Sequence, residues 1–81
     1  MNDIIIKIKD AAAKHNRVKI DAWYIDEDGF NEHTYFVLTD NDVNNTTSNY
    51  ERVIDRMNEL QVLYDKVTGF DRPAAGYNRS L

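Results

Sequence analysis

Apolar and polar residues alternate along two runs within residues 17–40, and the two runs meet at Glu27-Asp28-Gly29. Alternation with a period of two is typical of strands with one buried face, and a glycine at the reversal takes a positive φ at no steric cost. A three-residue loop with Gly29 in the left-handed conformation sets Ile20 opposite Phe36, whereas a two-residue loop mixes the two faces. We therefore predict an antiparallel hairpin with the three-residue loop.

The predicted register divides the hairpin into two faces. The first face is apolar along its length and holds Val18, Ile20, Ala22, Tyr24, Phe36 and Leu38. The second face is polar at its edges and holds Lys19, Asp21, Trp23, Ile25, Asn31, His33, Tyr35 and Val37. Two strands alone are marginally stable in water, and each has an unpaired edge. We therefore expect this sheet to have partners.

A first helix is predicted before the hairpin, from a cap at Asn2 or Asp3 to about residue 16. Its apolar positions follow helical spacing: Ile4, Ile5, Ile8, Ala11 and Ala12. The run of β-branched residues 4–6 also fits an edge strand, but that alternative leaves only one or two alanine-rich turns for a helix. The helical interpretation explains the whole segment.

A second, longer helix is predicted after a polar loop at residues 40–47. Ser48 and Glu51 have the spacing of a capping box. The apolar stripe that follows contains Tyr50, Val53, Ile54, Met57, Leu60, Tyr64 and Val67. Gly69 is expected to end this helix, with Phe70 packing back on Tyr64.

These elements predict an α+β fold, a small αββα single domain of residues 1–69 in which both helices cover the face bearing Ile20 and Phe36. Residues 70–81 form a tail that is loosely ordered or packs on a neighbour. A chain of this size buries only about 60% of the surface that its unfolded form exposes. We therefore predict a homodimer in which two hairpins pair edge to edge into a four-stranded sheet.

Charge is unevenly distributed along this chain, whose formal net charge is −4. Five cations precede or open the hairpin, namely Lys7, Lys9, Lys14, Arg17 and Lys19. From Asp21 to Glu51 there are eight carboxylates and no lysine or arginine. We therefore expect a basic end and an acidic end, which bears on partners more than on fold.

The composition also indicates the cellular compartment in which the protein is expected. The chain has no cysteine, so it has neither disulfides nor thiolate ligands, which fits a reducing interior. The first ten residues carry four isoleucines but no long apolar run, so we expect neither a signal peptide nor a membrane span. The expected location is the cytoplasm.

Groups that could support catalysis are sparse. The acidic run Asp26-Glu27-Asp28 fits a solvated hairpin tip, because no base or nucleophile accompanies it in sequence. His15 and His33 are the histidines, and His33 is expected opposite Trp23 as a partly covered cross-strand neighbour. We predict that the protein is not an enzyme, has no catalytic residues and uses no cofactor.

The sharpest motif-like pattern is the span from Asp40 to Glu51, where oxygen-bearing side chains recur at alternate positions as in an EF-hand calcium loop. Its candidate ligands include Asp40, Asp42, Asn44 and Glu51. Three features depart from that motif: Asn45 replaces the turn glycine, Thr47 replaces an aliphatic residue, and a strand precedes the span. A polar loop leading into a capping box explains the same residues, so calcium is the third of our functional hypotheses.

Two binding functions remain. In the first, the protein is an accessory or inhibitory factor that docks on a larger protein, with aromatic anchors and an acidic surround. The residues expected to bind that partner are Trp23, Ile25, Asp26, Glu27, Asp28, Tyr35 and Val37. In the alternative, the protein binds RNA or DNA, with cations on phosphates and an aromatic ring on a base. That site would use Lys7, Lys14, Arg17, Lys19 and Trp23.

Overall fold

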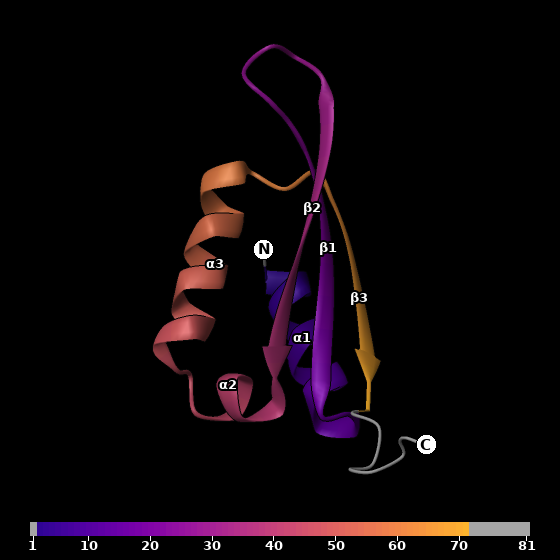
Figure 1. Cartoon of the computed structure of the whole chain (residues 1–81), viewed down its shortest axis with the longest axis vertical. Coiled ribbons are helices and arrows are strands. Elements are labelled where there is room, and N and C mark those ends of the chain that lie inside the picture. The colour runs from indigo at the N-terminus through magenta and orange to yellow at the C-terminus, as the bar shows by residue number, and fades with distance from the viewer. Residues whose placement is uncertain (1, 72–81) are drawn as a thin grey trace, which may run out of the picture.

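The computed structural model describes residues 2–71, which form three helices and three strands (Figure 1). In chain order the elements are α1 (Asn2–Lys14), β1 (Arg17–Ile25), β2 (Asn31–Thr39), α2 (Asp40–Asn44), α3 (Ser48–Leu60) and β3 (Tyr64–Phe70). The three strands form one antiparallel sheet in the order β2-β1-β3. The predicted α+β class is confirmed, with a third strand added to the hairpin.

The hairpin has the predicted register. Ile20 lies opposite Phe36, and the three-residue loop carries Gly29 at a φ of 87°. The Asp26 side chain stabilises this loop, because its Oδ1 accepts hydrogen bonds from the backbone N–H groups of Asp28 and Phe30, each at 2.9 Å. β1 and β2 extend past the end of α3, so the loop stands at a projecting tip (Figure 1).

The prediction of one long helix ending at Gly69 is wrong for the residues after Leu60. α3 ends at Leu60, and Gln61 takes the left-handed conformation that reverses the chain. Residues 64–70 then form β3, which pairs with β1 and places Val67 opposite Ile20. Gly69 is therefore a strand residue and does not cap a helix. The unpaired edge of β1 explains the outcome, since pairing satisfies a row of backbone groups that a longer α3 would leave exposed.

The polar loop predicted at residues 40–47 is also wrong in part, because it contains α2. Thr39 caps this helix in a reciprocal capping box with Asp42, and both hydrogen bonds measure 3.1 Å. Thr47, and not Ser48, caps α3 by accepting a bond from the backbone N–H of Tyr50 at 3.3 Å. The cap of α3 was misassigned because threonine and serine both serve as N-caps, so the chain path decides which of the two adjacent residues does so.

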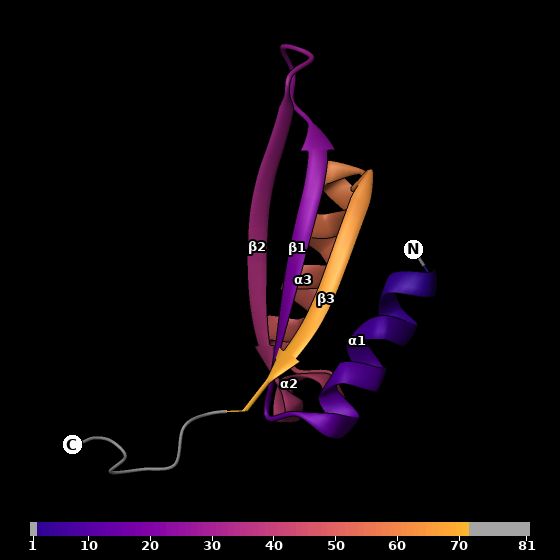
Figure 2. The same cartoon turned by 90° about the vertical axis from the view of Figure 1, so that its right-hand side faces the viewer.

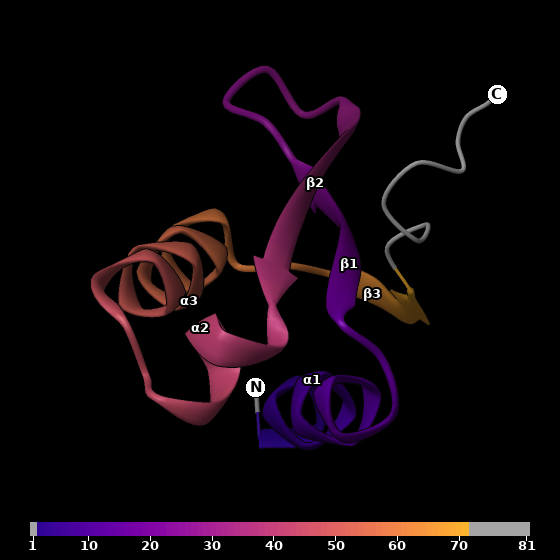
Figure 3. The ribbon, with the colours of Figure 1, turned by 60° about the horizontal axis from the view of Figure 1, so that its bottom comes forward.

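α1 and α3 cover one face of the sheet, as predicted. α1 contacts β1 and β3, and α3 contacts β1 and β2 (Figure 3). Their apolar faces meet the strands in a single core that contains Ile4, Ile8, Ala12, Val18, Ile20, Leu38, Val43, Tyr50, Val53 and Met57. No helix formed by residues 2–71 covers the opposite face of the sheet, and Figure 2 looks onto that face with α3 behind the strands.

β1 has a strand partner on both sides, so among the described strands the outer edge of β2 is the one edge of the hairpin that has no strand partner. The predicted edge-to-edge homodimer would therefore join two three-stranded sheets, and it stays a prediction. Phe70, placed in the tail by the sequence, is the last residue of β3, while residues 72–81 of that tail lie outside the described residues. Within residues 2–71, no helix has both the length and the apolar character needed to cross a membrane.

Candidate functional site

The helix-free face of the sheet, called the open face below, collects side chains from all three strands. Because side chains alternate along each strand, the pairing places fourteen of them there in rows. β1 contributes Arg17, Lys19, Asp21, Trp23 and Ile25, β2 contributes Asn31, His33, Tyr35, Val37 and Thr39, and β3 contributes Tyr64, Lys66, Thr68 and Phe70. The open face is therefore mixed, with aromatic, aliphatic and charged groups side by side.

Four exposed apolar side chains gather where the open face meets the projecting hairpin, and they form the hairpin-end patch. Trp23 is 42% exposed, Ile25 52%, Leu63 63% and Tyr64 57%. Trp23 lies opposite Tyr64 in the sheet, and its carbonyl oxygen accepts a 2.7 Å hydrogen bond from the backbone N–H of Leu63. Exposed apolar side chains that lie together mark interaction surfaces more reliably than single ones do.

Acidic groups surround this patch on the hairpin side. Asp26, Glu27 and Asp28 lie at the tip, whereas Glu32 on β2 pairs with Tyr24 and belongs to the helix-covered face. A hollow of about 330 Å³ separates the tip from α3. Its lining residues are Tyr24, Ile25, Asp26, Glu27, Arg56, Glu59 and Leu60. Arg56 pairs with Glu59 at 3.1 Å, so the one cation in this lining already has an acidic neighbour.

The far end of the open face, beside α2, is basic. Lys19 Nζ lies 5.1 Å from the centroid of the Tyr35 ring, and Arg17 Cζ lies 5.6 Å from that of Phe70. Lys66 is exposed in the adjoining row. These distances are typical of cation–π contacts, which hold each cation against a ring at the surface.

Asp21 lies between the two ends of the open face and is tied to its neighbours. Its Oδ1 is 2.9 Å from His33 Nε2 and 3.8 Å from Lys19 Nζ. The imidazole of His33 also lies against Trp23, with ring centroids 4.4 Å apart. A carboxylate in this position orients an imidazole. The expectation that the protein is not an enzyme stays a prediction.

The residues predicted for a protein partner fall in two neighbouring places. Trp23, Ile25, Tyr35 and Val37 share the open face, and the acidic run 26–28 lies at the tip beyond it. Tyr64 and Leu63 were missed because the sequence placed them in or near a helix. The signal that could have revealed β3 is the alternation of large and small residues along Tyr64–Phe70.

The five residues predicted for nucleic acid do not come together. Arg17, Lys19 and Trp23 share the open face, whereas Lys7 and Lys14 lie on α1 in the helix layer. Lys7 is held there by an ion pair with Asp65, at 3.2 Å. Lys66 and Phe70, which the sequence did not single out, join the open face instead.

The four predicted calcium ligands are not arranged as a metal site. The carboxylate of Asp42 accepts hydrogen bonds from the hydroxyl of Thr47 at 2.8 Å and from the side-chain amide of Asn49 at 3.0 Å, besides the backbone of Thr39. Residues 40–44 are helical and cannot wrap an ion as a calcium loop does. In residues 2–71 no group of three acidic or histidine side chains is placed to hold a metal.

These hydrogen bonds stabilise the charged form of Asp42. The backbone N–H of Thr39 is the main cause, and with the side chains of Thr47 and Asn49 it holds the pKa of Asp42 below its usual range, against the opposing effect of burial. Because its pKa is lower in the folded state than in the unfolded state, the Asp42 carboxylate stabilises the folded protein at pH values above the unfolded-state pKa of about 4. That contribution is lost as the pH falls through the folded-state pKa.

We therefore expect Asp42→Ala to lower the free energy of unfolding at pH 7 by about 1 kcal/mol, the usual cost of losing a capping group. The difference from the parent protein should shrink as the pH falls below about 4, since the parent loses the same interaction there. Urea denaturation at a series of pH values measures this. Asp40→Ala is the matched control in the same helical turn, because no hydrogen bond to the Asp40 side chain occurs among the described residues. Equal losses in both variants, constant with pH, would contradict the expectation.

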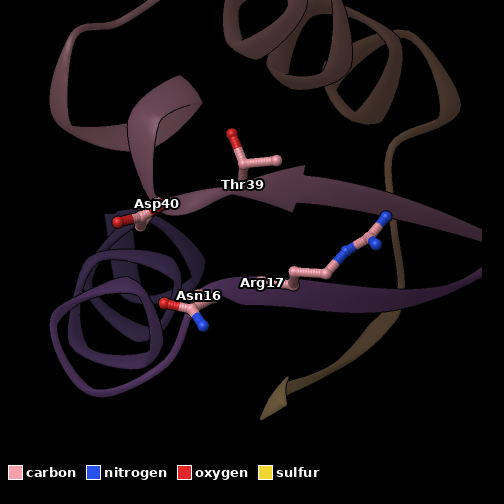
Figure 4. Close-up of a pocket in the computed structure, with 4 residues that line it drawn as sticks. All are labelled: Asn16, Arg17, Thr39 and Asp40. Carbon is pink, nitrogen blue, oxygen red and sulfur yellow. The ribbon is translucent and has the colours of Figure 1, made fainter. Parts of the chain in front are cut away.

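A small pocket of about 240 Å³ lies where β1 begins and β2 ends, lined by Asn16, Arg17, Thr39 and Asp40 (Figure 4). The backbone N–H of Asp40 donates to the carbonyl of Asn16 at 2.9 Å and closes its floor. Figure 4 shows the Arg17 side chain running along β1, away from Asp40. Among the described residues, the buried Nε of Arg17 has no hydrogen-bond partner.

Comparison of the chain with protein-family models, curated proteins and solved structures gave no match.

Proposed function

We propose that this protein is an accessory or inhibitory factor that docks on a larger protein through the hairpin-end patch. The observation that carries the proposal is the exposure of Trp23, Ile25 and Tyr64 at one end of the open face, with exposed Leu63 next to them in the turn before β3. Removing such side chains from water contributes about 25 cal/mol for each Å² of apolar surface buried. Aromatic anchors of this kind dominate binding energy at protein interfaces.

The surrounding charge indicates which partner chemistry fits. The patch leads into the hairpin loop that carries Asp26, Glu27 and Asp28, and no lysine or arginine occurs in the sequence between Asp21 and Glu51. A partner with an apolar pocket bordered by lysine or arginine would complement both features. Charges at the rim act mainly on the association rate and on partner choice. We therefore propose a basic rim on the partner, and we keep the cytoplasm as the proposed location because the chain has no cysteine.

Replacing Trp23 with alanine should weaken the complex by about 2 kcal/mol, or roughly thirtyfold, because the anchor is lost while the sheet is retained. Ile6→Ala is the matched control, since Ile6 is equally exposed but lies on α1, away from the open face. Tagged parent and variant proteins would be used to isolate partners from the source cells. A partner retained by the parent and by Ile6→Ala, but lost by Trp23→Ala, would then be purified and titrated by calorimetry.

Three results would count against this proposal. The first is a partner that binds Trp23→Ala as tightly as the parent. The second is a partner whose contact surface is acidic, because it would be repelled by the hairpin tip. The third is a stable homodimer, seen by light scattering, that Trp23→Ala dissociates, because a second copy of the chain would then occupy the patch. The predicted homodimer through the β2 edge would instead survive that substitution.

A further inference from the structure

The basic end of the open face has a sign of charge opposite to that of the whole chain. Arg17, Lys19 and Lys66 occupy three successive rows of the sheet, and Asp21 is the only acid on the open face. That carboxylate lies 2.9 Å from His33 Nε2 and 3.8 Å from Lys19 Nζ, so three cations face one acid there. A chain with a formal net charge of −4 thus presents a local cationic surface. Such a surface attracts a polyanion whatever the net charge, because charges beyond about 10 Å are screened at 0.1 M salt.

Two of these cations lie directly against aromatic rings. Lys19 contacts the exposed ring of Tyr35, and Arg17 contacts that of Phe70. The rings come from the two outer strands and the cations from the central one. Each pair can therefore offer a charge to a phosphate and a flat apolar surface to a base.

We propose that this end of the open face, made of Arg17, Lys19, Lys66, Tyr35 and Phe70, binds single-stranded nucleic acid. The site lies outside the hairpin-end patch and takes a different class of partner. Its cations neutralise phosphates, and its rings stack on unpaired bases, which is how flat sheets bind single strands.

The shape of the site favours a single strand over a duplex. Neighbouring strands lie about 4.8 Å apart, so the rings and cations form a low, level surface with nothing to enter a groove. The element that does project is the hairpin tip, and its three adjacent carboxylates would repel a duplex laid along the sheet. An acidic protein segment could pair with the cations but would leave the rings without a matching partner.

The test is fluorescence anisotropy with a labelled twelve-nucleotide oligothymidylate, titrated with the full chain between 50 and 200 mM salt. Each phosphate contact with a single strand contributes about −0.7 to the slope of the logarithm of the association constant against the logarithm of the salt concentration. Three contacts therefore predict a slope of about −2. Lys66→Glu should weaken binding by about tenfold and make the slope shallower. Lys9→Glu is the control, because it makes the same change of charge on the exposed side of α1 and should alter affinity less than twofold.

Tyr35→Ala should weaken binding by about tenfold while leaving the salt slope unchanged, which separates stacking from charge. Thermal melting followed by circular dichroism would establish that the variants fold. If Lys66→Glu does not fold, Lys66→Gln replaces it in the titration. The proposal is overturned by any of three results: no saturable binding at 50 mM salt, equal losses from Lys66→Glu and Lys9→Glu, or equally tight binding of polyglutamate. The last result would assign the surface to an acidic protein.

Discussion

Replacing Ile8 with alanine is expected to lower the free energy of unfolding by about 3 kcal/mol, the usual cost of removing a fully buried isoleucine. Ile8 is 0% exposed and lies in the core among residues of the sheet and of α1. The loss combines the transfer energy of the removed methylenes with the cavity left behind. The free energy of unfolding of small domains is only a few kcal/mol, so the variant should be largely unfolded near body temperature.

Ile6→Ala provides the matched comparison on the same helix. Ile6 is 57% exposed, so its truncation removes little buried surface. Alanine is also the better helix former, by a few tenths of a kcal/mol. Urea denaturation of both variants should therefore show a large loss for Ile8 and a change within about 0.5 kcal/mol for Ile6. Equal losses would contradict a helix at this place, because residues 6 and 8 share a face in a strand and not in a helix.

The hairpin was predictable because its determinants are local. Alternation fixes which residues share a face, and Gly29 fixes the loop, so the pairing of Ile20 with Phe36 follows from a few adjacent positions. α1 was predictable for a similar reason, since its apolar spacing runs through the whole element. The same alternation placed Trp23, Ile25 and Tyr35 on one face, and this part of the candidate site was therefore found from the sequence.

β3 was not predictable in the same way, because its apolar residues also fit a helix. Tyr64 and Val67 continue the helical spacing that runs through Leu60, whereas the alternation of residues 64–70 between more and less exposed positions is seen in the folded strand. What decides between them is the unpaired edge of β1, a feature of the folded sheet that no local window contains. Missing β3 hid Tyr64, Lys66 and Phe70, so the basic end of the open face could not be assembled from sequence. The short helix α2 was missed because five residues are too few to show a period.

Gly69→Ala is expected to destabilise the protein by about 2 kcal/mol, within the range found when a packed site is overfilled. A Cβ at this position would lie 2.0 Å from His15 Cδ2 and 2.5 Å from His15 Cγ, so the imidazole must move. Gly69 does not have a left-handed φ, so alanine costs nothing in backbone conformation there. The expected loss therefore arises from the contact between β3 and the residue that follows α1.

A double-mutant cycle isolates that contact. In the His15→Gly background all three atoms that a Cβ at residue 69 would meet most closely are removed, and Gly69→Ala should then cost less than about 0.5 kcal/mol. Alanine also restricts the unfolded chain more than glycine does, which favours folding by up to about 1 kcal/mol and can make the change stabilising. Thermal or urea unfolding of the four proteins measures the coupling. If Gly69→Ala still costs about 2 kcal/mol without the imidazole, the contact with His15 is not the cause of the loss. The requirement for glycine would then lie within β3 itself.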